Sequence, residues 1–415
     1  MADLVELKEI EERVILVAVS TEEESLAAAS LDELEELVET AGAVTVDKII
    51  QNRERIHPGT YLGKGKIEEV KERVWELNAT GIVCDDELSP AQLRNLEDAL
   101  DTKVMDRTMV ILDIFASRAT TREGKIQVEL AQLKYRAARL VGLRNSLSRL
   151  GGGIGTRGPG EKKLEVDRRL SNDRIGQLKA ELEDVKRHRD VARQQRTRNH
   201  TPVAAIVGYT NEGKSTLLNT LTDAGILAED KLFATLDPTT RNLELPGGEQ
   251  ILLTDTVGFI RKLPHNLIEA FKSTLEEAKY SDIILHVVDC SNPQMDMQMY
   301  VVYETLKDLG VHDKEVITVF NKIDAAGEMR IPRDLSSDYQ VKISAKTGEG
   351  LDELLNLLES ILRSRKVFLE RIYPYQDAGK IQLIRKYGQL LKEEYRDDGI
   401  FVSAYVPAEM YANLI

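Results

Sequence analysis

One stretch of the chain has the residue types and the spacing needed to bind a polyphosphate. Residues 208–215 follow the pattern Gly-x-x-x-x-Gly-Lys-Ser, after an apolar run at 203–207 and before a helical pattern. In this arrangement the backbone N–H groups of a glycine-rich turn surround the phosphate oxygens. Lys214 would reach the β- and γ-phosphates, and the Ser215 hydroxyl would bind Mg²⁺. The predicted phosphate-binding loop is Gly208, Tyr209, Thr210, Asn211, Glu212, Gly213, Lys214 and Ser215.

Three later motifs, each after an apolar run, indicate which nucleotide binds. Their residues are Asp255, Thr256, Val257 and Gly258; Asn321, Lys322, Ile323 and Asp324; and Ser344, Ala345 and Lys346. Asp255 would hold Mg²⁺ through a water molecule, and the Gly258 N–H would sense the γ-phosphate. Asp324 can accept two hydrogen bonds from guanine that adenine cannot donate, and a site built around such a bond discriminates by roughly 10⁴-fold. The Ala345 N–H would meet guanine O6, so the motifs together predict GTP.

The segment between the phosphate-binding loop and Asp255 is predicted to be a switch. Such a loop becomes ordered when it contacts the γ-phosphate and the metal. Its predicted nucleotide-binding residues are Phe233, Ala234, Thr235, Leu236 and Asp237. Thr235 is the preferred second Mg²⁺ hydroxyl, with Thr239 and Thr240 as alternatives, although each could serve only in turn formation. The residues assigned to catalysis are Lys214, Thr235 and Gly258.

The residue after Gly258 bears on the rate of hydrolysis. Many GTPases have a glutamine at this place, which orients the attacking water. This chain has Phe259, and a phenyl ring cannot orient water in that way. We therefore expect slow hydrolysis by the chain alone, and a need for a group supplied in trans or for another cation.

The elements that must position these motifs alternate between strands and helices. Strands are predicted at 203–207, 250–254, 282–288, 315–320 and 339–343. This alternation is typical of an α/β fold, so we predict a P-loop GTPase domain at 201–366, a mostly parallel sheet with helices on both faces. An N-terminal α/β domain is predicted at 1–125, with strands at 14–19 and 81–85 and helices at 31–41 and 67–77. A small C-terminal α+β domain is predicted at 367–415, with strands at 368–372 and 400–406 around a helix at 381–395.

Residues 126–200 have heptad spacing in two runs, which predicts an antiparallel helical hairpin with a glycine-rich tip. Residues 134–198 hold 18 Lys and Arg against 8 Asp and Glu, a balance of +10 within a chain whose net charge is −14. A basic segment in an otherwise acidic protein indicates a localised contact with a polyanion, and the arginine content favours RNA. The alternative is that these charges only solvate the helices. The predicted RNA contacts are Arg149, Gly153, Gly155 and Arg157.

Composition excludes several classes of protein. The 415 residues are too many for one core, and no run of 18 apolar residues is present. The two cysteines, Cys84 and Cys290, have neither the spacing of a zinc site nor that of a disulfide framework, which fits a reducing compartment. The N-terminus is acidic and lacks the pattern of a signal peptide. We expect a cytoplasmic monomer, with peripheral attachment to a membrane as an open alternative.

The switch segment 233–241, the motif that begins at Asp255, the phosphate-binding loop and the glycine-rich segment 151–161 together resemble the HflX family of ribosome-associated GTPases. The resemblance covers nearly the whole chain. It implies binding to the large ribosomal subunit, with the N-terminal domain and hairpin entering near the peptidyl-transferase centre. It also implies a role in ribosome splitting or rescue, protein synthesis or ribosome biogenesis, and a hydrophobic residue in place of the catalytic glutamine.

Two positions in the phosphate-binding loop raise further questions. In potassium-activated relatives an asparagine at the place of Asn211 binds a monovalent cation, so the resemblance implies a K⁺ site there. Glu212 stands where the family pattern has a small residue, and its carboxylate would repel a triphosphate unless the side chain turns outward. Glu212 and the missing glutamine keep open a second function, a GTP-sensing scaffold with negligible turnover that acts on a non-ribosomal protein or a membrane partner.

Overall fold

The structure is a computed structural model that describes residues 11–21, 24–150, 159–198, 201–222, 232–263, 277–327 and 331–415. The chain forms two compact units. The first comprises residues 1–185, 230–237 and 261–272, and the second comprises residues 186–229, 238–260 and 273–415. Two short segments from the middle of the chain therefore group with the N-terminal residues. The sequence-based division into four domains stays a prediction.

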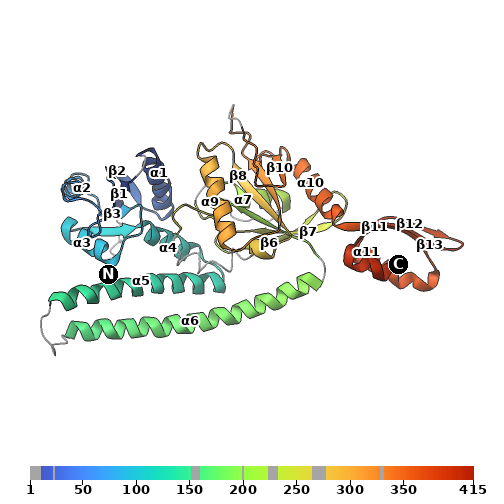
Figure 1. The fold of residues 1–415 in the computed structure, drawn as a ribbon, viewed down its shortest axis with the longest axis horizontal. Coiled ribbons are helices and arrows are strands. Elements are labelled where there is room, and N and C mark those ends of the chain that lie inside the picture. Colours follow the sequence, from blue (N-terminus) through green and yellow to red (C-terminus); the bar gives the residue numbers. More distant parts are fainter. Residues whose placement is uncertain are drawn as a thin grey trace, which may run out of the picture. The chain divides into compact units, whose positions relative to one another are not determined.

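The first unit contains a four-stranded parallel sheet in the order β2-β1-β3-β4 (Figure 1). The strands are β1 (Arg13–Ser20), β2 (Val44–Asn52), β3 (Gly81–Cys84) and β4 (Lys103–Asp106). The helices are α1 (Glu24–Thr40), α2 (Lys64–Glu76), α3 (Pro90–Leu100) and α4 (Arg107–Arg118). Apolar residues of α2 and α3 pack against one face of the sheet. The predicted strands and helices of this part are present, but β2, β4, α3 and α4 carried no sequence-based prediction.

The predicted helical hairpin is confirmed. It consists of α5 (Arg122–Leu150) and α6 (Pro159–Arg198), which run antiparallel (Figure 1). The apolar residues that pack between the helices are Ile126, Leu130, Leu133, Ile175, Leu178, Leu182 and Val185. Arg174 of α6 also forms two hydrogen bonds with the Glu129 carboxylate of α5, at 2.8 and 3.0 Å. The heptad spacing therefore identified the seam between the helices correctly.

The second unit contains a six-stranded sheet in the order β10-β9-β8-β5-β7-β6, with only the β6–β7 pair antiparallel. The strands are β5 (Val203–Gly208), β6 (Thr239–Glu244), β7 (Gln250–Asp255), β8 (Ile283–Asp289), β9 (Glu315–Asn321) and β10 (Tyr339–Lys342). Helices α7 (Lys214–Thr222) and α10 (Leu351–Ser364) share a core with one face of the sheet. Helix α9 (Met295–Asp308) packs on the other face. The predicted fold class, a mostly parallel sheet with helices on both faces, is confirmed.

The C-terminal part is an antiparallel sheet in the order β11-β13-β12, covered by short helices. Its elements are β11 (Lys366–Tyr373), the 3₁₀ turn η1 (Tyr375–Asp377), α11 (Ala378–Tyr387), β12 (Gln389–Arg396), β13 (Gly399–Pro407) and α12 (Ala408–Leu414). The predicted helix at 381–395 is wrong beyond Tyr387, because residues 389–396 pair with β13 instead. The change occurs at Gly388, where a Cβ would lie 2.8 Å from the Tyr405 carbonyl oxygen and 2.9 Å from that of Ile384.

Among the described residues, no helix combines the length and the apolar character that crossing a membrane requires.

A buried histidine should make the second unit sensitive to acid. His286 of β8 is fully buried, and its ring lies edge-on to Tyr303 of α9 with centroids 4.9 Å apart. Burial lowers the pKa of His286 to about 4. As the pH falls below the unfolded pKa of about 6.5, the unfolded chain binds a proton that the folded chain excludes, so this group lowers the unfolding free energy by about 2 kcal/mol at pH 5 relative to pH 7.

Replacing His286 with Phe should remove that share of the acid sensitivity. The measurement is the unfolding temperature at pH 7 and pH 5, and His312→Phe at an exposed position is the matched control. An equal loss between pH 7 and pH 5 in both variants would contradict the assignment.

Candidate nucleotide-binding site

The predicted phosphate-binding loop connects the end of β5 to the start of α7, at the carboxyl edge of the six-stranded sheet. Two backbone positions in the loop have left-handed φ angles, Asn211 at 62° and Gly213 at 87°. A Cβ on Gly213 would lie 2.5 Å from the Asn321 side-chain nitrogen. The glycine at this position therefore serves both the turn and the close approach of the guanine motif.

The guanine-recognition motif holds the phosphate-binding loop from behind. The Asn321 side-chain amide donates a hydrogen bond to the Glu212 carbonyl at 2.8 Å, and its oxygen accepts one from the Ala345 N–H at 2.9 Å. The Lys322 ammonium donates to the Asn211 carbonyl at 2.8 Å and pairs with Asp289 at 2.7 Å. The structure thus brings together three of the predicted motifs, and Asp324 is exposed at their edge.

Two oxygen-bearing side chains lie where the sequence placed the metal. The Ser215 hydroxyl donates a hydrogen bond to the Asp255 carboxylate at 2.7 Å, and Asp255 is fully buried. A hydroxyl beside a carboxylate is the hard-oxygen pair that Mg²⁺ prefers, so these residues fit the ion. Next to them, the buried Lys214 ammonium donates to the Tyr209 carbonyl. Burial lowers the pKa of Lys214, and the Glu212 and Asp255 carboxylates oppose that shift.

The Glu212 side chain does not turn outward. Its carboxyl group is buried and accepts a hydrogen bond from the Tyr209 N–H. Burial raises the pKa of Glu212, against the opposing effect of the Lys214 ammonium. The expectation that this side chain turns outward is therefore wrong, because its carboxyl group folds back onto the Tyr209 N–H.

Phe259 has a structural role at this site. Its side chain is buried, its N–H donates to the Gly208 carbonyl at 3.0 Å, and its carbonyl accepts from the Thr210 N–H at 2.8 Å. The backbone after Gly258 is therefore paired directly with the phosphate-binding loop. A Cβ on Gly258 would lie 2.9 Å from the Thr210 Cα and 3.0 Å from the Lys214 ammonium, so this position also requires a glycine.

The candidate magnesium hydroxyls of the first switch differ in their placement. Thr239 and Thr240 belong to β6, where the Thr240 hydroxyl is 2.9 Å from that of Thr254. Thr235 lies in the segment 230–237, which groups with the first unit. Of the three candidates, Thr235 is the one that lies outside the strands of the sheet. Its role as the second Mg²⁺ hydroxyl stays a prediction.

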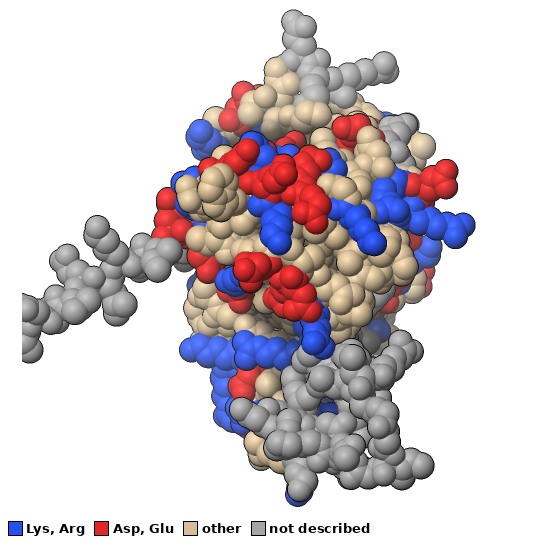
Figure 2. Space-filling view, turned by 90° about the vertical axis from the view of Figure 1, so that its left-hand side faces the viewer, with Lys and Arg blue, Asp and Glu red and all other residues tan. Residues whose placement is uncertain are grey.

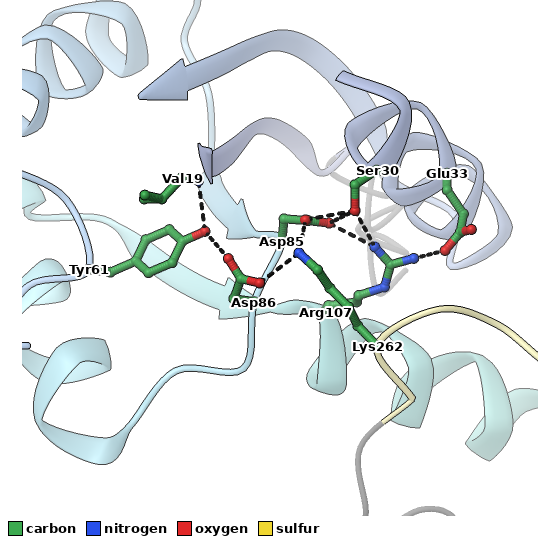
Figure 3. Close-up of polar contacts among 8 residues, drawn as sticks. All are labelled: Val19, Ser30, Glu33, Tyr61, Asp85, Asp86, Arg107 and Lys262. Carbon is green, nitrogen blue, oxygen red and sulfur yellow. Dashed lines mark hydrogen bonds and ion pairs between the residues drawn. The ribbon is translucent and has the colours of Figure 1, made fainter. Parts of the chain in front are cut away.

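Sequence reasoning missed the partners of two residues near the switches. The Asp237 carboxylate accepts hydrogen bonds from Thr120 and Thr121, which immediately precede α5. Lys262, four residues after Gly258, pairs with Asp85 and Asp86 at the end of β3 (Figure 3). The partners are 117 and 177 residues apart in sequence, so no local pattern could have revealed them.

The predicted RNA contacts cannot be placed. Gly153, Gly155 and Arg157 lie outside the described residues, and Arg149 is described only as part of the α5 backbone. Where Figure 2 shows charged side chains, acidic and basic groups are interspersed over the surface. The contact with a polyanion therefore stays a prediction for the hairpin.

Known proteins resemble the chain along most of its length. Three family models match it: "GTP-binding GTPase N-terminal" at 28–116, "GTP-binding GTPase Middle Region" at 118–196 and "50S ribosome-binding GTPase" at 203–322. A GTPase HflX of Lacrimispora saccharolytica is 84% identical over 100% of this chain and 98% of its own length. One from Caldanaerobacter subterraneus is 50% identical over 99% and 94% of the two lengths. A crystal structure of SsGBP with GDP is 26% identical, covers 84% of this chain and 98% of its own, and has a TM-score of 0.47.

Proposed function

Because the chain belongs to the HflX family and is a GTP-hydrolysing enzyme, we propose that it binds GTP with Mg²⁺ and couples hydrolysis to its association with the large ribosomal subunit. One observation supports the binding of GTP: hydrogen bonds join three of the predicted motifs at one edge of the sheet. In this proposal the Gly208–Ser215 loop surrounds the phosphates, Asp324 recognises guanine, and Gly258 senses the γ-phosphate. The Ala345 N–H donates to the Asn321 amide oxygen in the structure, and it would have to leave that oxygen to reach guanine O6.

In this proposal Ser215, Thr235 and Asp255 would hold Mg²⁺. When bound, the ion neutralises charge that develops on the phosphate oxygens. Lys214 adds a positive charge at the β- and γ-phosphates, and Gly258 donates its N–H to the γ-phosphate. The buried Phe259 fixes the backbone that carries the Gly258 N–H. Its phenyl ring cannot orient the attacking water. Slow turnover by the chain alone follows from that arrangement.

We expect potassium to accelerate turnover if a monovalent cation supplies the missing charge. Asn211 is the proposed ligand, and its φ of 62° places it at the sharp bend of the loop. GTP hydrolysis should be faster in KCl than in NaCl at equal ionic strength, and Asn211→Ala should abolish the difference. Equal rates of hydrolysis in the two salts for the unaltered protein would contradict the assignment of Asn211 as a cation ligand.

The ribosomal half of the proposal rests on two observations. The family model at 203–322 is described as a 50S ribosome-binding GTPase, and residues 134–198 carry a balance of +10. A helical hairpin of this charge suits the phosphate backbone of ribosomal RNA. Within this role, release or splitting of ribosomes, rescue, protein synthesis and biogenesis all remain compatible. A cytoplasmic location follows from a ribosomal partner.

Purified large ribosomal subunits test this proposal directly. We expect them to stimulate GTP turnover strongly in potassium buffer, because the trigger that Phe259 cannot supply would then come from the partner. GTP binding without any stimulation would instead favour a GTP-sensing scaffold that acts on another protein or a membrane.

Charge reversal tests the hairpin itself. Arg149→Glu together with Arg157→Glu should lower subunit affinity at least tenfold and flatten its salt dependence, because each phosphate contact contributes to counterion release. GTP affinity should not change. The matched control reverses two exposed lysines of the C-terminal part, Lys386→Glu and Lys392→Glu. An equal loss of subunit affinity in both double variants would refute a specific role for the hairpin.

A further inference from the structure

The Asp237 carboxylate binds the two threonines that precede the first helix of the hairpin, α5. One carboxylate oxygen accepts from the Thr120 N–H at 3.0 Å, the Thr120 hydroxyl at 2.8 Å and the Thr121 N–H at 2.9 Å. The other accepts from the Thr121 hydroxyl at 2.5 Å. These donors precede α5, where a helix leaves N–H groups without partners and favours negative charge. The Thr121 hydroxyl caps α5, because it accepts from the Gly124 N–H at 3.0 Å, and a residue of the first switch thus holds this cap in place.

The surroundings of Asp237 are adapted to this contact. Gly124, in the first turn of α5, lies so close that a Cβ there would collide with the Asp237 carboxylate. On the other side of Thr235, the buried Phe233 ring packs edge-on against Phe115 of α4, with centroids 4.7 Å apart. The chain on both sides of the proposed magnesium ligand is therefore fastened to the first unit.

The segment after Gly258 has a separate attachment at the N-terminal sheet. The Lys262 ammonium pairs with Asp86 at 2.6 Å and with the buried Asp85 (Figure 3). Both carboxylates follow β3, beside β1, where the order β2-β1-β3-β4 changes direction. The edge outside such a point is where open parallel sheets usually receive ligands. Here the ammonium group of Lys262 is bound at that edge.

The acidic group that receives Lys262 is itself held in place. Asp85 accepts hydrogen bonds from the Ser30 hydroxyl at 2.8 and 3.0 Å and from the buried Arg107 at 2.7 Å. Arg107 also pairs with Glu33, and the Tyr61 hydroxyl donates to Asp86 at 2.7 Å. The carboxylates are therefore positioned by the N-terminal fold and do not depend on Lys262 for their orientation.

Backbone strain marks the same two segments. Phe233 and Lys262 have φ angles of 55° and 53°, in the left-handed region that is unfavourable for a residue with a side chain. Such angles persist only where surrounding contacts determine them, and they cluster at switch and active sites. We therefore attribute the φ angles of Phe233 and Lys262 to the contacts that these residues make with the first unit.

We propose that Asp237 and Lys262 are positioning residues for GTP hydrolysis, which fasten the first switch to α5 and the segment after Gly258 to the N-terminal sheet. Thr235 and the Gly258 donor then need less ordering when GTP binds, so hydrolysis depends on residues of the first unit. GDP, which lacks the γ-phosphate, is insensitive to both attachments. This inference rests on the proposed role of Thr235, and not on the ribosomal role.

A mutant cycle between the switch and the helix tests the first attachment. The variants are Asp237→Ala, Thr121→Val and the double variant. Ser117→Ala is the matched control, because its hydroxyl donates to the Ile114 carbonyl of its own helix. Each variant of the cycle should lower kcat/KM for GTP about tenfold, since a released loop must be ordered anew. The double variant should lose no more than either single variant, and the control should not change.

The same cycle applies to the second attachment. Lys262→Ala should lower kcat/KM for GTP about fivefold, and Asp86→Asn should lower it less, because the contact of Lys262 with Asp85 remains. The double variant should lose no more than Lys262→Ala. Lys262→Arg should restore most of the loss. Asp98→Asn on α3 is the control, since Asp98 pairs with Arg94 of its own helix at 3.6 Å.

Nucleotide affinity supplies a second readout. Each Asp237, Thr121, Lys262 or Asp86 variant should weaken binding of a non-hydrolysable GTP analogue while the GDP dissociation constant stays within about twofold, which also shows that the variant folds. Additive losses in the cycles, or equal losses for GDP and the analogue, would overturn the proposal. Turnover that survives Thr235→Ala would overturn the magnesium assignment on which this inference rests. Turnover that Thr235→Ala abolishes, together with additive cycles, would overturn the inference alone.

Discussion

Asp324→Asn should lower GTP affinity by roughly 10³- to 10⁴-fold and confer binding of XTP, because the substitution reverses the hydrogen-bonding character of one atom. The carboxylate accepts from guanine N1 and N2, whereas the asparagine amide nitrogen can only donate. Xanthine carries a carbonyl oxygen where guanine has its N2 amine, so it suits the amide. The Asn321 and Lys322 contacts that hold the phosphate-binding loop do not involve Asp324, and the loop should keep its shape.

The measurement is a pair of dissociation constants, for GDP and XDP, in the original protein and the variant. Asp308→Asn at an exposed position of α9 is the matched control and should leave both constants unchanged. A variant that loses GDP without gaining XDP would show that Asp324 supports the loop and does not recognise the base.

The meeting of the proposed nucleotide-binding motifs could be predicted from sequence because each motif is local. Each motif is a few residues long and follows a strand, and carboxyl ends of parallel strands meet at one edge, so order along the chain sufficed to bring the motifs together. The buried position of Glu212 could not be foreseen, since it depends on how the side chain folds back onto the Tyr209 N–H. Local spacing contains no information about that contact.

The attachments of Asp237 and Lys262 lay beyond sequence reasoning for a different reason. Thr120, Thr121, Asp85 and Asp86 are common polar residues without motif spacing, and they become partners only through the fold of the first unit. The error after Tyr387 is of a third kind. Residues 389–396 carry helix-compatible side chains, and pairing with β13 outweighs that weak local preference.

Gly213→Ala should lower the affinity for both GTP and GDP by about 100-fold, because the new methyl group meets a buried amide and the backbone is strained. The added Cβ would lie 2.5 Å from the Asn321 nitrogen, and Asn321 is the side chain that joins the phosphate-binding loop to Ala345. Displacing that amide loosens the phosphate-binding and base-recognition motifs together. The loss should therefore appear for every guanine nucleotide, unlike the loss expected of the attachment variants.

A second glycine separates collision from strain. Gly248 has a φ of 80°, close to the 87° of Gly213, but a Cβ there would meet no heavy atom within 4 Å. Gly248→Ala thus suffers the backbone cost of about 1 kcal/mol without the contact, and should lower the unfolding temperature while leaving nucleotide affinity intact. Asn321→Ala should reproduce the affinity loss and be non-additive with Gly213→Ala, because both variants remove one amide contact. Full additivity, or an equal affinity loss in Gly248→Ala, would show that backbone strain and not the Asn321 contact makes Gly213 necessary.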